Sequence, residues 1–178
     1  IESFPGLHEG KANYYEVITR RKSNLALDGD NGVSVEFWLN KYSFDTDSTE
    51  KEVVFDLWNG EASSSAGYGR LTIELNGAAS GTPFLATIQS GTYGFFQQSI
   101  GVTPTSTTLM DWNHYAFTFV SSSDQIETKF YLNGNLDQTQ NIGTIFNEVT
   151  GALIANIGAL RTAPSGNAFY ETDDEGER

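Results

Sequence analysis

Apolar and polar residues alternate with a period of two in several short segments of this chain, and no long segment shows the 3.6-residue period of a helix. In VSVEFWLN the odd-numbered residues 33 to 39 are apolar and share one face of a strand, while Glu36 and Trp38 lie on the other. The segments EVVFDLWNG (52–60) and LTIELNG (71–77) repeat this pattern. Each predicts a half-buried antiparallel strand, so the chain is predicted to be all-β.

Asn-Gly pairs punctuate these strands at 31–32, 59–60, 76–77 and 133–134. Such pairs supply the positive φ that tight turns require. The clearest hairpin is TKFYLNGNLDQTQ, in which the chain turns at 133–134 and the second arm begins near Leu136. Many short strands with no helical interludes favour two packed antiparallel sheets, that is, a β-sandwich or jelly roll. Gly/Ser-rich loops at 61–69, 75–83 and 121–124 are where a rigid sandwich would carry binding residues.

Length and charge bound the function. A chain of 178 residues is expected to form one domain, and its ends at Ile1 and Arg178 suggest a fragment of a longer protein. The net charge of −13 disfavours nucleic acid as a partner, and no apolar run approaches the ~20 residues of a membrane span. The absence of cysteine and of N-glycosylation sequons favours a bacterial or viral source.

Three stretches, taken in order, resemble one known family. SVEFWLN (34–40) is similar to an early strand of that family, and WNHYAFTFV (112–120) to its W-x-H-aliphatic-A strand start. KFYLNGNLDQ (129–138) followed by LIANIGAL (153–160) resembles its late hairpin and its L-x-I-G strand. The family is the laminin-G-like group of the concanavalin A-like lectin/glucanase superfamily. The resemblance covers about residues 25 to 160.

This resemblance implies a concanavalin A-like, laminin-G-like jelly roll. The same fold carries lectins, calcium-dependent adhesion modules, glycosidases and inert spacers. We expect a non-catalytic, lectin-like module that engages carbohydrate through rim loops or a concave face, outside the cell, on a cell surface or on a virion. The alternative is a structural or adhesive domain that assembles with other parts of its parent protein, and a glycoside hydrolase is the third choice. The family usually adds a strand after the L-x-I-G segment, so a sheet edge is expected to stay open here.

The Trp-His pair in WNHYAFTFV is predicted to be part of the frame. Tyr115, Phe117 and Phe119 alternate with smaller or polar residues, which places His114 on a covered or half-covered face. We expect Trp112 to close one end of the sandwich. The E-x-D-x-E spacing at 171–175 matches a glucanase motif but lacks apolar anchors, so it is predicted to be an exposed acidic tail. No catalytic residue is therefore predicted.

Sugar binding requires exposed aromatic rings beside amides or carboxylates, because a pyranose has apolar C–H faces and hydroxyl edges. Three places in the sequence offer this combination, although core packing is the alternative for each ring. The candidates are Trp38 with Glu36, Trp58 at the end of its strand, and Tyr93, Phe95, Phe96, Gln97 and Gln98 in SGTYGFFQQ.

A calcium site is suggested by DGDNG, in which Asp28, Asp30 and Asn31 offer two carboxylates and an amide oxygen between glycines. The same residues are also those that a tight turn favours. The pairs Asp45 with Asp47 and Asp111 with Asn113 are weaker candidates. Ca²⁺ is accordingly the cofactor that the sequence suggests.

Overall fold

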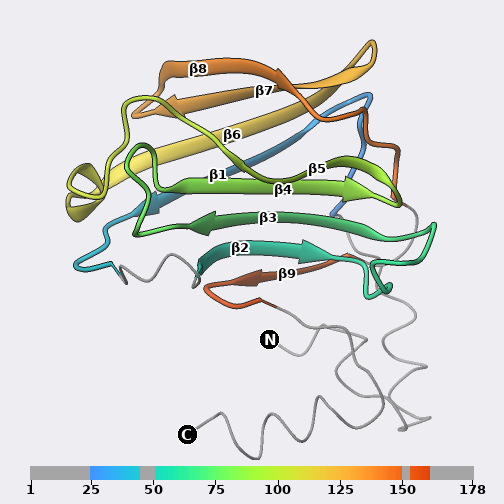
Figure 1. Ribbon diagram of the computed structural model, residues 1–178, viewed down its shortest axis with the longest axis horizontal. Helices are drawn as coiled ribbons and strands as arrows, with labels where there is room; N and C mark the ends of the chain where they lie inside the picture. Colours follow the sequence, from blue (N-terminus) through green and yellow to red (C-terminus); the bar gives the residue numbers. More distant parts are fainter. Residues whose placement is uncertain (1–24, 45–50, 150–152, 161–178) are drawn as a thin grey trace, which may run out of the picture.

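The computed structural model describes residues 25–44, 51–149 and 153–160 (Figure 1). Within these residues the chain forms nine strands and one 3₁₀ turn, Thr108–Met110. The strands are β1 (Val33–Leu39), β2 (Glu52–Trp58), β3 (Gly69–Leu75), β4 (Phe84–Ser90), β5 (Tyr93–Ser99), β6 (Asn113–Ser122), β7 (Gln125–Leu132), β8 (Asn135–Ile142) and β9 (Ile154–Ile157). The all-β prediction is confirmed.

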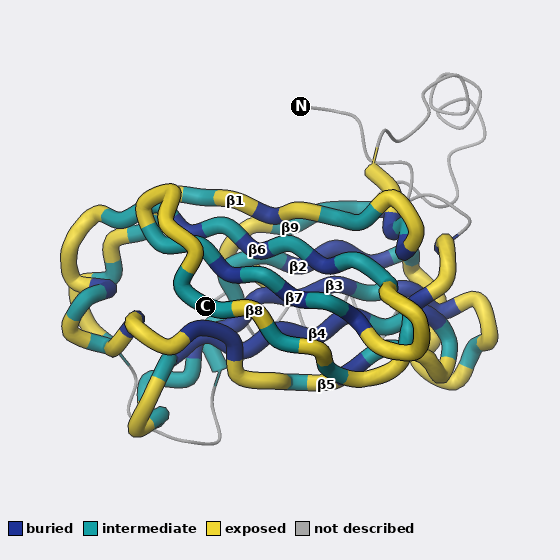
Figure 2. The backbone as a smooth tube through the Cα atoms, turned by 90° about the horizontal axis from the view of Figure 1, so that it is seen from above, coloured by how far each residue is buried: buried dark blue, intermediate teal, exposed yellow. Residues whose placement is uncertain are grey.

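The strands form two antiparallel sheets that pack face to face. One sheet has four strands in the order β1-β6-β7-β8, and the other has five in the order β5-β4-β3-β2-β9. Figure 2 shows the four-stranded sheet lying over the five-stranded one, with β1 on the side of β9 and β2 and with β8 on the side of β4 and β5. This is the predicted β-sandwich, and each sheet follows the antiparallel pairing typical of a jelly roll.

The core lies between the sheets and is rich in phenylalanine. Phe117 of β6 lies at the centre, with its ring centroid 4.8 Å from Phe130 of β7 and 5.3 Å from Phe84 of β4. Burying one such ring contributes up to ~3 kcal/mol to stability. Strand alternation brings these side chains inward, as predicted for 115–119 and for Leu71, Ile73 and Leu75. The other fully buried residues include Leu71, Ile73, Ile88, Tyr115 and Phe119. The prediction that β3 is half-buried is wrong, because Thr72 and Glu74 on its other face are buried as well.

The predicted hairpin at 133–134 is confirmed. Asn133 and Gly134 have φ values of 50° and 80° and join β7 to β8. Two consecutive residues of positive φ match the right-handed twist of the flanking strands. The Asn133 side chain adds two contacts, because its Oδ1 accepts the His114 N–H at 2.9 Å and its Nδ2 donates to Asn113 Oδ1 at 2.8 Å. The turn thus fixes the register of β6 as well.

One strand face differs from prediction. The sequence pattern placed Val53, Phe55 and Leu57 on one face of β2, but the pairing with β3 shifts between Val53 and Phe55. Phe55 therefore lies opposite Ile73 and packs, partly buried, against the core, while Val53 lies opposite Glu74. An extra residue of this kind reverses the side-chain direction locally, and period-two alternation gives no warning of it.

The prediction that Trp112 closes one end of the sandwich is wrong. Its side chain is 69% exposed, just before β6 begins. His114 is half-buried on the outer face of the four-stranded sheet, as expected. There it lies opposite Trp38 of β1. The inward set Tyr115, Phe117 and Phe119 is buried as predicted.

One set of loops lies at the end of the sandwich that is at the right of Figure 1. These loops precede β1, join β2 to β3, β4 to β5 and β6 to β7, and follow β8. Backbone hydrogen bonds tie them together: Ser121 N–H donates to Gly29 O at 2.9 Å, and Val149 N–H donates to Leu27 O at 2.9 Å. This end of the fold is a rim made of segments that are distant in sequence.

Candidate functional site

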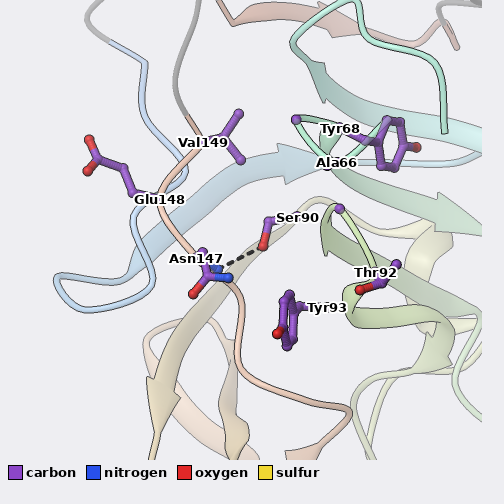
Figure 3. A pocket seen from close by; sticks show the side chains of 10 residues that line it. Ala66, Tyr68, Ser90, Thr92, Tyr93, Asn147, Glu148 and Val149 are labelled. Carbon is purple, nitrogen blue, oxygen red and sulfur yellow. Dashed lines mark hydrogen bonds between the residues drawn. The ribbon is translucent and has the colours of Figure 1, made fainter. Parts of the chain in front are cut away.

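A pocket of about 250 Å³ opens at this rim (Figure 3). It is lined by residues 66–68 from the β2–β3 loop, 90–93 from the β4–β5 turn, and 147–149 from the segment after β8. We call it the rim pocket. Most of its lining lies on loops held by a rigid sandwich, which is where binding residues concentrate in β-sandwich proteins.

Short hydrogen bonds join the three segments. The Gly91 N–H donates to Tyr68 O at 2.7 Å, and the Asn147 N–H donates to Ser90 Oγ at 2.7 Å, shown dashed in Figure 3. Gly91 has a φ of 58°, and a Cβ there would lie 2.9 Å from Ala66 O. Only glycine accommodates both the positive φ and this close approach. The pocket is therefore built into the fold.

Two tyrosines give the pocket its aromatic character. Tyr68 is 7% exposed, whereas Tyr93 is 47% exposed and offers a ring to solvent. In Figure 3 Asn147 is seen on one side of Tyr93 and Thr92 on the other, while Glu148 points away from both tyrosines. An aromatic face bordered by amide and hydroxyl groups can pack against an apolar surface and hydrogen-bond to its polar edges.

Tyr93 is the predicted ligand-binding residue that the structure places in this pocket. Its neighbours along β5 lie elsewhere. Phe95 is 6% exposed and packs in the core, 6.1 Å from the Phe119 ring, so the expectation of a binding role for Phe95 is corrected to a packing role. Phe96 is 61% exposed on the outer side, and Gln97 Nε2 donates to Glu74 Oε2 at 3.3 Å. Gln98 is exposed and donates to Phe96 O.

Trp38 and Glu36 form a second, separate surface on the outer face of the four-stranded sheet. Trp38 is 65% exposed, and its ring centroid lies 5.4 Å from that of His114. Glu36 Oε2 lies 3.5 Å from His114 Nε2. The strand register brings these residues together, because Trp38 pairs with His114 across β1 and β6. The sequence placed Trp38 on the less apolar face of its strand but gave no sign of its histidine neighbour.

Trp58 is not available as a stacking surface. Its side chain is 2% exposed, its Nε1 donates to Glu61 O at 2.9 Å, and the Arg70 guanidinium lies 5.4 Å from its ring centroid. A buried indole whose N–H is satisfied and whose face carries a cation serves packing. The predicted binding role for Trp58 is corrected accordingly.

The predicted calcium ligands form a closed turn. Asp28 Oδ1 accepts the N–H groups of Asp30 and Asn31 at 2.9 and 3.1 Å, and Oδ2 accepts Asn31 Nδ2 at 2.6 Å. The side-chain bond from Asn31, aided by the backbone N–H bonds, holds the pKa of Asp28 below its usual range. This is the geometry of an Asx turn.

Within residues 25–44, 51–149 and 153–160 no cluster of three or more His, Cys, Asp or Glu side chains is arranged to hold a metal. The weaker candidate pair 45 and 47, and the acidic run 171–175, lie outside the described residues. Asp111 is exposed, and Asn113 Nδ2 donates to the carbonyl oxygens of Thr108 and Asp111. Calcium binding stays a prediction.

Several pocket residues were not singled out in the sequence. Tyr68 lies in the Gly/Ser-rich loop 61–69, which was expected to be a binding loop, so composition gave a partial signal. The sequence gave no such signal for Asn147 and Glu148, because they follow β8 in a segment that shows neither turn-forming residues nor a periodic pattern. Hydrogen bonds to segments distant in sequence bring them to the pocket, among them the bond from the Asn147 N–H to Ser90 Oγ.

The comparisons with known proteins agree with the architecture. Residues 10–170 match a family model described as the Concanavalin A-like lectin/glucanases superfamily. No curated protein and no solved structure matches the chain. No helix in the described part of the chain is long and apolar enough to cross a bilayer.

Proposed function

Because the chain belongs to the laminin-G-like family of the concanavalin A-like lectin/glucanase superfamily, we propose that it is a non-catalytic extracellular module that binds a neutral glycan in the rim pocket. Laminin-G-like domains are generally non-catalytic and typically extracellular, although the superfamily includes glycosidases. A place on a cell surface or a virion is part of the proposal. The fold supports a binding module in general, and the lining of the rim pocket supports a glycan as its ligand.

The half-exposed ring of Tyr93 carries the proposal. It stands in a pocket whose polar lining groups include the hydroxyls of Ser90 and Thr92 and the amide of Asn147, beside the carboxylate of Glu148. A sugar ring can lay its C–H face on the tyrosine and direct its hydroxyls to these groups. The volume of about 250 Å³ lies just below the ~300–1,000 Å³ of typical small-molecule sites, which suits one or two sugar residues.

The charges favour a neutral glycan over an anionic one. Glu148 is the charged residue in the pocket lining, and no lysine or arginine of the described residues lines it. The whole chain carries a net charge of −13. A sulfate or carboxylate on the sugar would meet repulsion without a cation to offset it.

Calcium is an accessory element of the proposal. The Asp28 turn lies at the same rim, since Leu27 O accepts the Val149 N–H. A Ca²⁺ ion held by Asp28, Asp30 and Asn31 would have to replace the hydrogen bonds that the Asp28 carboxylate already accepts. Glycan binding in the rim pocket does not depend on this ion.

The test is a glycan array probed with and without millimolar Ca²⁺, followed by calorimetry on the best neutral glycan. Tyr93→Ala and Asn147→Ala should each weaken binding about tenfold or more, the equivalent of ~1.4 kcal/mol. Tyr42→Ala is the matched control, because Tyr42 is 91% exposed and lies before β2, outside the rim pocket.

Three outcomes would overturn the proposal: no glycan bound in either condition, preference for sulfated or sialylated glycans, or full affinity in both pocket variants. In the last case Trp38→Ala distinguishes the surface at Trp38 and His114 from the rim pocket as the binding site.

A second candidate function, assembly within a larger protein, has one observation in its favour. An apolar groove runs along β1, one of the two edge strands of the four-stranded sheet. Its lining differs from that of the rim pocket, so the two functions are compatible.

A further inference from the structure

The groove along β1 has a volume of about 450 Å³. It is lined by residues 34–39 of β1, by Val54 and Phe55 of β2, and by Leu25 and Ile157. We call it the β1 groove. It lies along the side of the sandwich that holds β1, β2 and β9 (Figure 2). Apolar side chains that elsewhere face the core are accessible here, because neither sheet extends further on this side among the described strands.

Three large apolar side chains of the groove are exposed, and one of them is Leu25, at 44%. Trp38 is 65% exposed on β1, and Ile157 is 87% exposed at the end of β9. Val54 and Phe55 between them are partly buried and pack against the core. Contiguous exposed apolar surface of this kind marks an interaction site more often than scattered single residues do.

The backbone of β1 offers hydrogen-bonding groups along the groove. Among the described strands β1 pairs with β6 alone, so it is an edge strand. In an antiparallel pair alternate N–H and C=O groups point away from the partner strand, and at an edge they offer a row of hydrogen-bonding groups. An extended segment can pair with this row while its alternate side chains enter the apolar groove. Neither a sugar nor a helix uses both features.

The negative charge at the β1 groove favours a positively charged binding partner. Glu36 is the charged residue of the lining, its side chain is 73% exposed, and the chain as a whole is strongly acidic. Self-pairing of two β1 strands centred on Glu36 would set the two carboxylates opposite each other, which is destabilising. We propose that the β1 groove binds an extended segment of a partner protein, with apolar residues alternating with lysine or arginine, by addition of a strand to β1.

The test uses a fluorescent octapeptide of alternating lysine and valine, a matched peptide of alternating glutamate and valine, and a lysine-valine peptide with proline at a central position. The full chain should bind the lysine peptide about tenfold more tightly than either other peptide. Amide exchange by NMR should slow at alternate residues of β1, because those N–H groups become hydrogen-bonded.

Variants locate the site. Ile157→Ser should weaken the lysine peptide about tenfold by removing apolar contact, and Glu36→Lys should reverse the preference toward the glutamate peptide. Both side chains are largely exposed, so the fold tolerates the changes. Leu136→Ser is the matched control, because Leu136 is 56% exposed on β8 at the opposite edge of the same sheet.

Unchanged affinity in Ile157→Ser, equal binding of the proline peptide, or unprotected β1 amides would each overturn the proposal. A concentration-dependent dimer that Ile157→Ser abolishes, without peptide binding, would assign the groove to a second copy of the chain instead. Glycan binding in the rim pocket would be unaffected by any of these results, since the two sites share no lining residue.

Discussion

The Arg70 guanidinium donates two hydrogen bonds to the Asp56 carboxylate, from Nε to Oδ1 at 2.8 Å and from Nη2 to Oδ2 at 3.1 Å. The two residues lie on neighbouring strands β3 and β2, and the Asp56 side chain is fully buried. Burial disfavours the charged form of Arg70, but the hydrogen bonds and the attraction of Asp56 outweigh it and raise the pKa of Arg70. The pair makes a charged group acceptable on a buried part of the five-stranded sheet.

Removal of one partner of this pair should be costly. Asp56→Ala leaves the Arg70 cation partly buried without its bidentate acceptor, and we expect a loss of about 3–5 kcal/mol in the free energy of unfolding. Urea denaturation measures it. Glu127→Ala, which breaks the surface pair with Lys129, should leave the urea midpoint nearly unchanged. Similar losses of stability in Asp56→Ala and Glu127→Ala would contradict a special contribution of the buried pair.

Replacing Thr128 with valine should make the folded protein more stable. Its side chain is 1% exposed on β7, and its Oγ1 has no hydrogen-bond partner. Thr128→Val removes a buried unsatisfied hydroxyl at almost constant shape, so we expect a gain of about 1 kcal/mol. Thr87→Val is the contrasting variant. Thr87 is also buried, but its Oγ1 accepts the Gln97 N–H at 3.0 Å, so the same change should destabilise. Thermal denaturation of both variants checks the opposite signs.

Gly94 and Gly134 should respond differently to alanine. Both have positive φ, at 106° and 80°, which costs an alanine ~1–2 kcal/mol. A Cβ on Gly94 would also lie 2.0 Å from Ile88 O, whereas a Cβ on Gly134 meets nothing within 4 Å. Gly94→Ala should therefore lose at least about 3 kcal/mol, since backbone must move, and Gly134→Ala only the conformational cost. Equal losses by urea denaturation would count against this packing.

Asp137 should make stability depend on pH in acid. Burial alone would raise its pKa, but hydrogen bonds from Thr103 and Val102 outweigh it and lower the pKa below the ordinary 3.8. The contacts include the Val102 N–H at 2.6 Å and the Thr103 N–H at 3.1 Å. Because the folded pKa is the lower one, the stabilisation is fully present above the unfolded value and is lost as pH falls through the folded value.

The variant Asp137→Asn tests this dependence. It should cost about 1 kcal/mol at neutral pH, since an amide oxygen replaces a carboxylate in a partly solvated site. Measured by urea denaturation, the difference from the wild-type chain should shrink as pH falls below 3.8. A difference that stayed constant down to pH ~2 would show that Asp137 acts through packing and not through its charge.

The candidate sites show which features of side-chain exposure the local sequence pattern can predict. Trp38 was expected on the less apolar face of its strand and is exposed there, because alternation within one strand decides which face a residue occupies. Alternation within the strand did not decide the exposure of Trp58, which is buried because Arg70 of the neighbouring strand covers its ring. Whether an outward side chain meets solvent depends on its neighbours across the sheet, and a single sequence does not encode them locally.

The sequence by itself determined the strands, the 133–134 turn and the sandwich class, since side-chain alternation and the positive φ of Asn-Gly pairs act over a few residues. Only the tertiary structure decided where binding can occur. The rim pocket joins residues 66–68, 90–93 and 147–149, and the β1 groove joins the first and last described strands. The pairing register within the two sheets determines which residues that are distant in sequence come into contact. A single register shift, such as that between Val53 and Phe55, changes which side chains are neighbours.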